Sequence, residues 1–361
     1  MTGGVCALPS CAVRILITGG AGFVGSNLAL ALRREFPQGD IVCTDNLYRR
    51  GSELNVARLR EGNVVFAWGD VREEGSFPPG PFDFLIECSA EPSVLAGQKG
   101  GAAGLLQTNL VGACHCLEKA RLWGSRLVFL SSSRVYPVAP LERHPWREEA
   151  TRFVWAQNGV PGIGPQGVAE SLDMSGARSL YGYTKYAAEL LVEEYRAAWG
   201  LKAVVDRCGV VAGPWQFGKV DQGVASLWVL AHHFGRPLHY IGYGGQGKQV
   251  RDFLHIDDLC ELLAEQLREF DRWEGWVGNV AGGPANTASL CELTALCQEI
   301  TGRSVPIQPV LPNRPWDLRI FVADCRRLFE RTAWRPRRGV RQIVSDLSEW
   351  AAQNEAQLRN L

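Results

Sequence analysis

Residues 18–25 read Thr-Gly-Gly-Ala-Gly-Phe-Val-Gly, and the fold is decided around this stretch. It follows an apolar run at residues 13–18, typical of a buried strand, and it precedes a helical pattern at residues 26–35. Glycines at this spacing allow a tight turn and let a phosphate reach the backbone N–H groups at a helix N-terminus. The stretch therefore predicts a strand–turn–helix unit that binds a phosphate. The competing interpretation is a glycine-rich turn with a structural role alone.

An acidic residue follows at the distance that dinucleotide binding requires. Asp45 lies about 20 residues beyond Gly25, at the end of a second predicted strand at residues 41–44. A carboxylate there accepts hydrogen bonds from the ribose hydroxyls and repels a 2′-phosphate, so the sequence favours NAD over NADP. Arg49 and Arg50 oppose this preference slightly, because a nearby arginine can accommodate a 2′-phosphate.

Short apolar runs alternate with helical patterns through the N-terminal half. Further strands are predicted at residues 64–68, 82–88, 126–130 and 203–207, and helices at residues 106–122 and 184–199. This alternation predicts an α/β fold, a Rossmann-type doubly wound parallel sheet, followed by a smaller α+β C-terminal substrate domain. The approximate division is 1–207 and 238–282 for the NAD-binding domain, and 208–237 and 283–361 for the substrate domain.

One long segment interrupts this rhythm. Residues 137–178 contain several prolines and glycines and show no clear period. Because long loops without secondary structure are uncommon in compact domains, the segment is interpreted as a lid or an irregular substrate loop.

Tyr181 and Lys185 occur in Tyr-Gly-Tyr-Thr-Lys, and on a helix residues four apart share a face. A phenol, with a pKa near 10, is a poor base at neutral pH. An ammonium one turn away, with a positive nicotinamide ring, favours the phenolate, which could take a proton from a substrate hydroxyl while hydride leaves its carbon. Upstream, the strand at residues 127–130 runs into Ser131-Ser132-Ser133, where a hydroxyl could hydrogen-bond the substrate oxygen. The alternative is a serine-rich turn and a surface Tyr/Lys pair.

Composition narrows the possible functions. The 361 residues carry 38 basic and 38 acidic side chains, a balance that argues against a nucleic-acid partner. The 11 cysteines form no Cys-x-x-Cys pair, so no metal site is expected. No run approaches the ~20 apolar residues of a membrane span, and the first dozen residues do not resemble a signal peptide. We expect a cytoplasmic protein without a membrane partner.

Taken together, residues 18–25, Ser-Ser-Ser-Arg-Val-Tyr136 and Tyr181-x-x-x-Lys185 resemble the extended short-chain dehydrogenase/reductase family of nucleotide-sugar enzymes. The similarity covers most of the chain. Other matching stretches are Gly69-Asp70-Val71, Thr-Asn109-Leu-Val-Gly112, Gly247-Lys-Gln-Val-Arg251-Asp-Phe-Leu-His-Ile-Asp257 and Arg319-Ile-Phe-Val-Ala-Asp324. Two stretches depart from the pattern. Glu87-Cys88-Ser89-Ala90 stands where the family has His-Leu-Ala-Ala, and Val210 replaces an Asn that commonly helps to hold the nucleotide sugar.

The resemblance implies a role for each matching position. The implied catalytic residues are Ser132, Tyr181 and Lys185, with Ser133 as the alternative hydroxyl. Contacts to NAD are implied for Gly19, Gly22, Phe23, Val24, Gly25, Asp45, Asn46, Asp70, Val71, Ser89, Ala90, Asn109, Tyr181 and Lys185. Contacts to a nucleotide-diphosphate sugar are implied for Ser133, Gln222, Arg251 and Arg319. A homodimer formed through the helices at residues 106–122 and 184–199 is also implied.

The resemblance also bears on the reaction. Dehydratases of the family carry Thr-Asp-Glu before the Val-Tyr pair, whereas this chain has Ser132-Ser133-Arg134. The implied activity is therefore NAD-dependent epimerisation, in which hydride is removed to give a ketone and returned to the opposite face. Asp221-Gln222-Gly223 and the long interval from Ser132 to Tyr181 resemble the CDP-paratose 2-epimerase (CDP-tyvelose epimerase) branch. The alternatives are a UDP-sugar 4-epimerase, a nucleotide-sugar dehydratase or ketoreductase, and a non-catalytic dinucleotide sensor.

Overall fold

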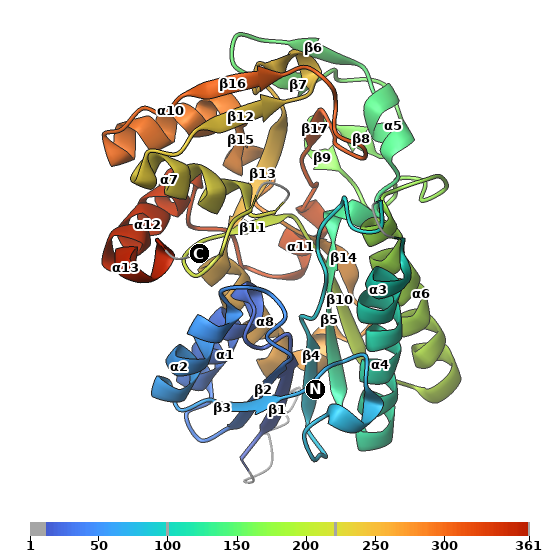
Figure 1. Cartoon of the computed structure of the whole chain (residues 1–361). Helices are drawn as coiled ribbons and strands as arrows, with labels where there is room; N and C mark the ends of the chain where they lie inside the picture. The colour runs from blue at the N-terminus through green and yellow to red at the C-terminus, as the bar shows by residue number, and fades with distance from the viewer. Residues whose placement is uncertain (1–11, 99–100, 220–221, 360–361) are drawn as a thin grey trace.

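The larger part of the molecule is built on a seven-stranded parallel sheet. The structure, a computed structural model, describes residues 12–98, 101–219 and 222–359 (Figure 1). The strand order is β14-β10-β5-β4-β1-β2-β3, and every neighbouring pair is parallel. The strands are β1 (Arg14–Thr18), β2 (Asp40–Asp45), β3 (Val65–Trp68), β4 (Phe84–Glu87), β5 (Arg126–Ser132), β10 (Ala203–Cys208) and β14 (Val277–Val280). This is the predicted doubly wound fold.

Helices cover both faces of this sheet (Figure 1). One face carries α1 (Phe23–Glu35), α2 (Ser52–Glu61) and α8 (Ile256–Arg268), and the other carries α3 (Ala103–Leu106), α4 (Gly112–Trp123) and α6 (Leu180–Trp199). Side chains alternate along β1: Ile15 and Ile17 pack towards α1 and α8, whereas Leu16 packs towards α4 and α6. Both faces of the strands are therefore buried, which explains their continuous apolar sequences.

A smaller lobe lies beyond the C-terminal ends of these strands (Figure 1). It contains a four-stranded sheet, a strand pair and three helices that share one apolar core. The sheet is formed by β11 (Val210–Ala212), β13 (Val250–His255), β15 (Thr287–Ser289) and β17 (Ile320–Phe321), and the pair by β12 (Leu238–Ile241) and β16 (Ile307–Val310). The helices are α7 (Val224–Phe234), α10 (Leu290–Thr301) and α12 (Val340–Gln353), followed by the short α13 (Glu355–Leu358). Two other short helices, α9 (Phe270–Trp273) and α11 (Arg326–Arg331), pack against the core of the large sheet.

The predicted domain boundary requires a correction. We assigned residues 238–282 to the NAD-binding domain, but β12 and β13 pair with β16, β11, β15 and β17 of the smaller lobe. Of that segment, α8, α9 and β14 return to the large sheet. Local patterning did not reveal this, because strand partners far apart in the chain are chosen by tertiary packing.

The expectation of an irregular loop at residues 137–178 is also corrected. The segment contains α5 (Val138–Arg143) and two small hairpins, β6 (Trp146–Glu148) with β7 (Phe153–Trp155) and β8 (Ile163–Gly164) with β9 (Gly167–Val168). Backbone hydrogen bonds from Phe153 to Lys248 and from Val168 to Val322 attach the hairpins to the smaller lobe. The insertion is thus an ordered part of that lobe.

Asp206, on β10, is a fully buried acid whose carboxylate accepts hydrogen bonds from uncharged side chains. Its Oδ1 accepts hydrogen bonds from Gln266 Nε2 (3.0 Å) and Trp276 Nε1 (3.1 Å), while Oδ2 has no partner. Burial raises the pKa of Asp206 to about 7, and the two hydrogen bonds offset only part of that effect.

This raised pKa predicts a pH-dependent stability. The folded state keeps the Asp206 proton where the unfolded chain has released it, so stability falls as pH rises from about 4 to 7, by up to ~1.4 kcal/mol per pH unit. Asp206→Asn, an isostere of the protonated acid, should lack this fall and gain stability relative to wild type across that window. Urea unfolding at pH 4.5, 6 and 7.5 measures the difference. Asp271→Asn, at an exposed acid, is the control; a pH-independent difference for Asp206→Asn would contradict the assignment.

Candidate active site

The glycine-rich stretch forms a tight turn between β1 and α1. Its backbone is closed by hydrogen bonds from Gly22 N to Gly19 O and from Gly20 N to Thr44 O, each 3.0 Å. A Cβ on Gly25 would lie 2.4 Å from the Gly19 carbonyl oxygen. At Gly19 φ is +61°, and a Cβ there would lie 2.8 Å from the Cys88 backbone. The turn therefore excludes side chains and leaves the N-terminus of α1 open to a phosphate.

An acidic group closes one end of the cavity beside this turn. Asp45 accepts hydrogen bonds from Leu47 N (2.8 Å) and Ala21 N (3.2 Å), and it lines a cavity of about 420 Å³ with Asn46 and Val71. Burial raises the pKa of Asp45, and the backbone hydrogen bonds oppose this. The turn and this carboxylate fit the diphosphate and ribose of NAD, respectively.

Asp70 supports this end of the cavity. Its carboxylate accepts hydrogen bonds from Asn46 Nδ2 (3.0 Å) and pairs with Arg72, whose hydrogen bonds are the main cause of the lowered pKa of Asp70. Asp70 itself is not among the lining residues of the cavity, although Gly69, Val71 and Arg72 are. The structure thus places Asp70 as a support for Asn46.

Asn109 likewise supports the site from behind. It lies in a π-helical turn, Gln107–Val111, between α3 and α4, and such turns often mark functional sites. Its side chain exchanges hydrogen bonds with the Glu91 backbone (2.8 and 3.1 Å) and donates to Thr184 Oγ1 (3.1 Å). Asn109 therefore fixes the loop after β4, whose Ser89 and Ala90 line the cavity, to α6.

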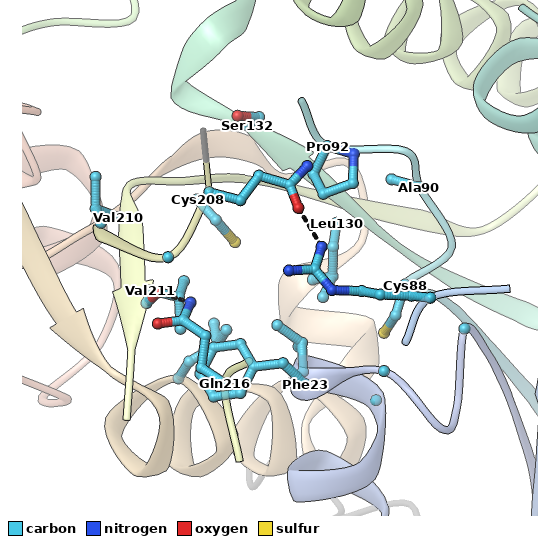
Figure 2. A pocket seen from close by; sticks show the side chains of 18 of the residues that line it. Phe23, Cys88, Ala90, Pro92, Leu130, Ser132, Cys208, Val210, Val211 and Gln216 are labelled. Carbon is cyan, nitrogen blue, oxygen red and sulfur yellow. Dashed lines mark hydrogen bonds between the residues drawn. The ribbon is translucent and has the colours of Figure 1, made fainter. Parts of the chain in front are cut away.

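The three predicted catalytic residues meet in an adjoining cavity. Ser132, Tyr181 and Lys185 line a space of about 370 Å³, together with the glycine turn, Phe23 and Val24. In Figure 2 Ser132 lies at one edge of this cavity, with Cys88 and Ala90 on the side of the β4 loop and Val210 and Val211 on the side of β11.

Local sequence places these three candidate residues. Helix α6 begins at Ser179, whose hydroxyl accepts a hydrogen bond from Gly182 N (3.0 Å), so Tyr181 and Lys185 fall in its first two turns. Gly182 is required for close packing, since a Cβ there would lie 2.1 Å from the Arg134 carbonyl oxygen. Ser132 ends β5, and its Oγ accepts a hydrogen bond from Arg134 N (3.2 Å).

Lys185 also has a partner that the sequence analysis did not foresee. Its Nζ lies 3.0 Å from Glu87 Oε2, and both side chains are almost completely buried. Glu87 was noted only as a departure from the family pattern, because nothing local connects residues so far apart in the chain.

A third cavity, of about 280 Å³, continues from the catalytic one into the smaller lobe. The third cavity is also lined by Arg251 and Asp317, and the lining residues that the two share are Val94, Arg134, Val210, Gln222 and Gly223. Burial lowers the pKa of Arg134 to about 10, and the nearby Arg251 contributes to that shift. Arg251 pairs with Asp317 at 2.8 Å. Two guanidinium groups facing one carboxylate leave a net positive charge at this junction.

Arg134 was missed as a candidate binding residue. The sequence analysis used it only as evidence against a dehydratase, although its position directly after Ser133 was the available signal. Gln222 lines both cavities and accepts a hydrogen bond from Arg49, and Gln222 Nε2 donates to Glu91 Oε1 (3.2 Å). Ser133 lines the catalytic cavity.

Arg319 does not follow the expectation of a phosphate contact. It is not among the lining residues of the three cavities. Its Nη1 pairs with Glu142 Oε2 at 2.9 Å, and its guanidinium stacks on Trp146 (4.2 Å to the ring centroid) and Tyr243 (4.8 Å). These contacts brace the 137–178 insertion against the smaller lobe, so we no longer assign Arg319 to the substrate.

The fold and this site define a Rossmann-type enzyme class with a Ser/Tyr/Lys centre beside a dinucleotide turn. Residues 15–281 match the NAD dependent epimerase/dehydratase family, and the chain belongs to that family. NAD is accordingly its cofactor.

Several relatives match nearly end to end. The chain is 29% identical to the CDP-paratose 2-epimerase of Salmonella typhi over 355 residues, covering 94% of this chain and 99% of the relative. It is 25% identical to the dTDP-glucose 4,6-dehydratase of Salmonella typhimurium, covering 97% of this chain and 95% of the relative. The crystal structure of UDP-glucose 4-epimerase with UDP-glucose from Thermotoga maritima superposes with a TM-score of 0.75 at 24% identity, covering 95% of this chain and 100% of that one.

No helix among the described residues is long and apolar enough to cross a membrane. Within the same ranges, no group of three or more His, Cys, Asp or Glu side chains is arranged to hold a metal ion.

The geometry of the glycine turn predicts a selective loss of cofactor binding. Gly25→Ala places a methyl group against the Gly19 carbonyl and displaces the turn, so we expect NAD affinity to fall at least roughly tenfold, equivalent to ~1.4 kcal/mol. Isothermal titration with NAD, of proteins first freed of bound cofactor, measures this. Gly75→Ala, at a glycine with no neighbouring atoms within 4 Å of the added Cβ, is the control. Unchanged affinity in a folded Gly25→Ala protein would contradict the assignment of the turn.

Proposed function

We propose that the protein epimerises a nucleotide-diphosphate sugar, with CDP-paratose or CDP-tyvelose as the substrate and carbon 2 as the inverted centre. The observation that carries this proposal is the meeting of Ser132, Tyr181 and Lys185 with the glycine turn in one cavity, which opens into a second, arginine-lined cavity. The similarity to the CDP-paratose 2-epimerase of Salmonella typhi over nearly its whole length supports the choice of sugar.

Each catalytic side chain has a distinct task in this proposal. Tyr181 takes the proton from the sugar hydroxyl and returns it later in the cycle. Ser132 donates a hydrogen bond to the same sugar oxygen and orients it. The ammonium of Lys185 favours the phenolate of Tyr181 by its positive charge. When bound at the glycine turn and Asp45, NAD would supply a reversible hydride acceptor, so the reaction would have no net redox change.

The junction between the cavities suits the diphosphate of the substrate. Arg134 and Arg251 offer guanidinium N–H donors in the planar arrangement that phosphate oxygens accept. Asp317 holds Arg251 in place through their ion pair. With the diphosphate at this junction, the sugar would extend towards Ser132 and the nucleoside into the third cavity.

Dehydration is the weaker proposal, although a dehydratase is among the relatives. Elimination of water needs an acid and a base beside the sugar, and Ser133 and Arg134 occupy the positions where the family's dehydratases carry Asp and Glu. A second candidate reaction is 4-epimerisation of a UDP-sugar, because the same Ser/Tyr/Lys centre can act on another carbon and a UDP-glucose 4-epimerase shares the fold.

Proton NMR of CDP-paratose, incubated with the purified protein and no added NAD, tests the proposal directly. A new anomeric signal at constant redox state is expected. UDP-glucose and dTDP-glucose, incubated in parallel, test 4-epimerisation and dehydration. Turnover of either of these without turnover of CDP-paratose would replace the proposed reaction.

Tyr181 provides the corresponding variant test. Tyr181→Phe removes the proton-accepting oxygen, so we expect kcat to fall by about 10²–10⁴-fold while NAD affinity stays within a few-fold of wild type. Tyr183→Phe alters an exposed residue on the same helix and should retain activity. Wild-type turnover by Tyr181→Phe would exclude Tyr181 as the base.

We also propose a homodimer formed through α4 and α6. These helices expose large apolar side chains, including Leu122, Leu190 and Trp199, which are 60%, 52% and 57% exposed. Such residues on one outer face are typical of an interaction surface.

Leu190→Glu should weaken this dimer, because association would bury a charged carboxylate without a partner. Light scattering at micromolar concentration is expected to give the mass of a dimer for wild type and a lower mass for the variant. Leu311→Glu, at an exposed leucine of the smaller lobe, should leave the mass unchanged. A monomeric wild-type protein would remove the proposal.

A further inference from the structure

The buried partner of Lys185 occupies a defined place in the sheet. Glu87 is the last residue of β4, and the strand register sets it between Thr18 on β1 and Phe129 on β5. Its Oε2 accepts a hydrogen bond from Lys185 Nζ at 3.0 Å, and the two side chains are only 3% and 4% exposed. The carboxylate therefore lies at the C-terminal ends of the strands, where the glycine turn begins. From there it contacts Lys185 on α6.

Several further titratable groups, on α6 itself and on other elements, interact with the same ammonium. They are Tyr181 on α6, Cys88 after β4, Cys116 on α4 and Cys208 on β10. Burial raises the pKa of all three thiols, so they are neutral near pH 7. The Phe129 ring also lies against the ammonium, with Nζ 4.5 Å from its centroid. Glu87 is thus the carboxylate that balances this charge.

A buried ammonium needs such a partner to keep its proton. Burial by itself lowers the pKa of Lys185, but Glu87, and then Tyr181, reverse this effect and leave that pKa raised. The carboxylate uses only one of the three donors of the ammonium, so two stay available for other groups.

We propose that Glu87 is a positioning residue of the active site, which fixes Lys185 in place and keeps it protonated so that its charge can act on Tyr181. The role in turnover rests on the proposed function of Tyr181 and Lys185. The charge state of Lys185 does not, so it can be tested without substrate or added cofactor.

The first test measures thermal unfolding midpoints against pH for wild type and Glu87→Gln. The amide leaves Lys185 buried without a counter-charge, so the folded variant loses the lysine proton more readily than its unfolded chain. The stability of the variant then rises with pH. At pH 7 we expect the unfolding midpoint of the variant to lie several degrees below that of wild type. This difference between the two midpoints should become steadily smaller towards pH 9.5.

A second buried ion pair provides the matched control. Glu189 and Arg207 lie 2.7 Å apart and are 5% and 8% exposed. Glu189→Gln should also lower the unfolding midpoint. Because Arg207 does not lose its proton in this pH range, the difference from the wild-type midpoint should stay the same as pH rises. If the midpoint difference for Glu87→Gln were as independent of pH as that for Glu189→Gln, the proposal would be overturned. Glu87 would then be a packing partner alone.

The double variant Glu87→Gln/Lys185→Met keeps the test decisive if Glu87→Gln does not fold. With both charged groups removed, no unpaired ammonium is left, so the double variant should be more stable than Glu87→Gln. The difference between its unfolding midpoint and that of wild type should not become smaller as pH rises. A double variant no more stable than Glu87→Gln would count against the ion pair.

The second test follows turnover. In wild type the raised pKa of Lys185 means that kcat should begin to fall only at high pH. In Glu87→Gln this fall in kcat should begin at a pH lower by one unit or more. At pH 9 the variant should therefore lose at least roughly tenfold more activity than at pH 7. The proposal would be overturned if kcat of the variant were lower by the same factor at every pH and fell at the same pH as in wild type. Absence of wild-type turnover would refute the proposed function instead, and the thermal test would still decide the role of Glu87.

Discussion

The structure depends on the close approach of three backbones at the glycine turn. Gly19, Gly20 and Gly25 have no space for a Cβ: the atoms in the way belong to the residues after β4, to Cys43 on β2 and to the turn itself. The ends of β1, β2 and β4 can meet there because these residues lack side chains. This contact sets where α1 begins, and the cavities on either side of the turn follow from it. Its small neighbours, Cys43 and Cys88, fit the same constraint, since a thiol packs as a small apolar group.

Helix α6 is held to the sheet by two buried ion pairs. Lys185 bonds to Glu87 on β4, and one turn further Glu189 bonds to Arg207 on β10 and accepts a hydrogen bond from Ser131 Oγ (2.5 Å). Burying a charged pair brings little net stability, but loss of one partner is costly, because the other is left unpaired. These pairs therefore contribute more to the position of α6 than to overall stability. Tyr181, in the first turn of α6, is thereby held at the cavity that Ser132 also lines.

The smaller lobe completes the site instead of forming a separate module. Its β11 and the residues around Arg251 and Asp317 line the cavities that begin at the glycine turn. The 137–178 insertion packs against this lobe, with Arg319 held between Glu142 and aromatic rings. A long segment without clear periodicity is thus an ordered brace, because its short hairpins bond within the segment and further backbone hydrogen bonds attach it to distant residues such as Lys248 and Val322.

The sequence by itself determined the parallel α/β fold, the glycine turn with Asp45, and the placement of Tyr181 and Lys185 one turn apart on one helix. Each of these depends on local periodicity or on short spacing along one element, which a single chain displays directly. The tertiary structure decided the rest. It placed β12 and β13 in the smaller lobe, Arg134 at the cavities and Arg319 outside them, and it paired Glu87 with Lys185. These contacts join residues far apart in the chain, and their geometry is fixed only when the elements pack, so no local pattern could specify them.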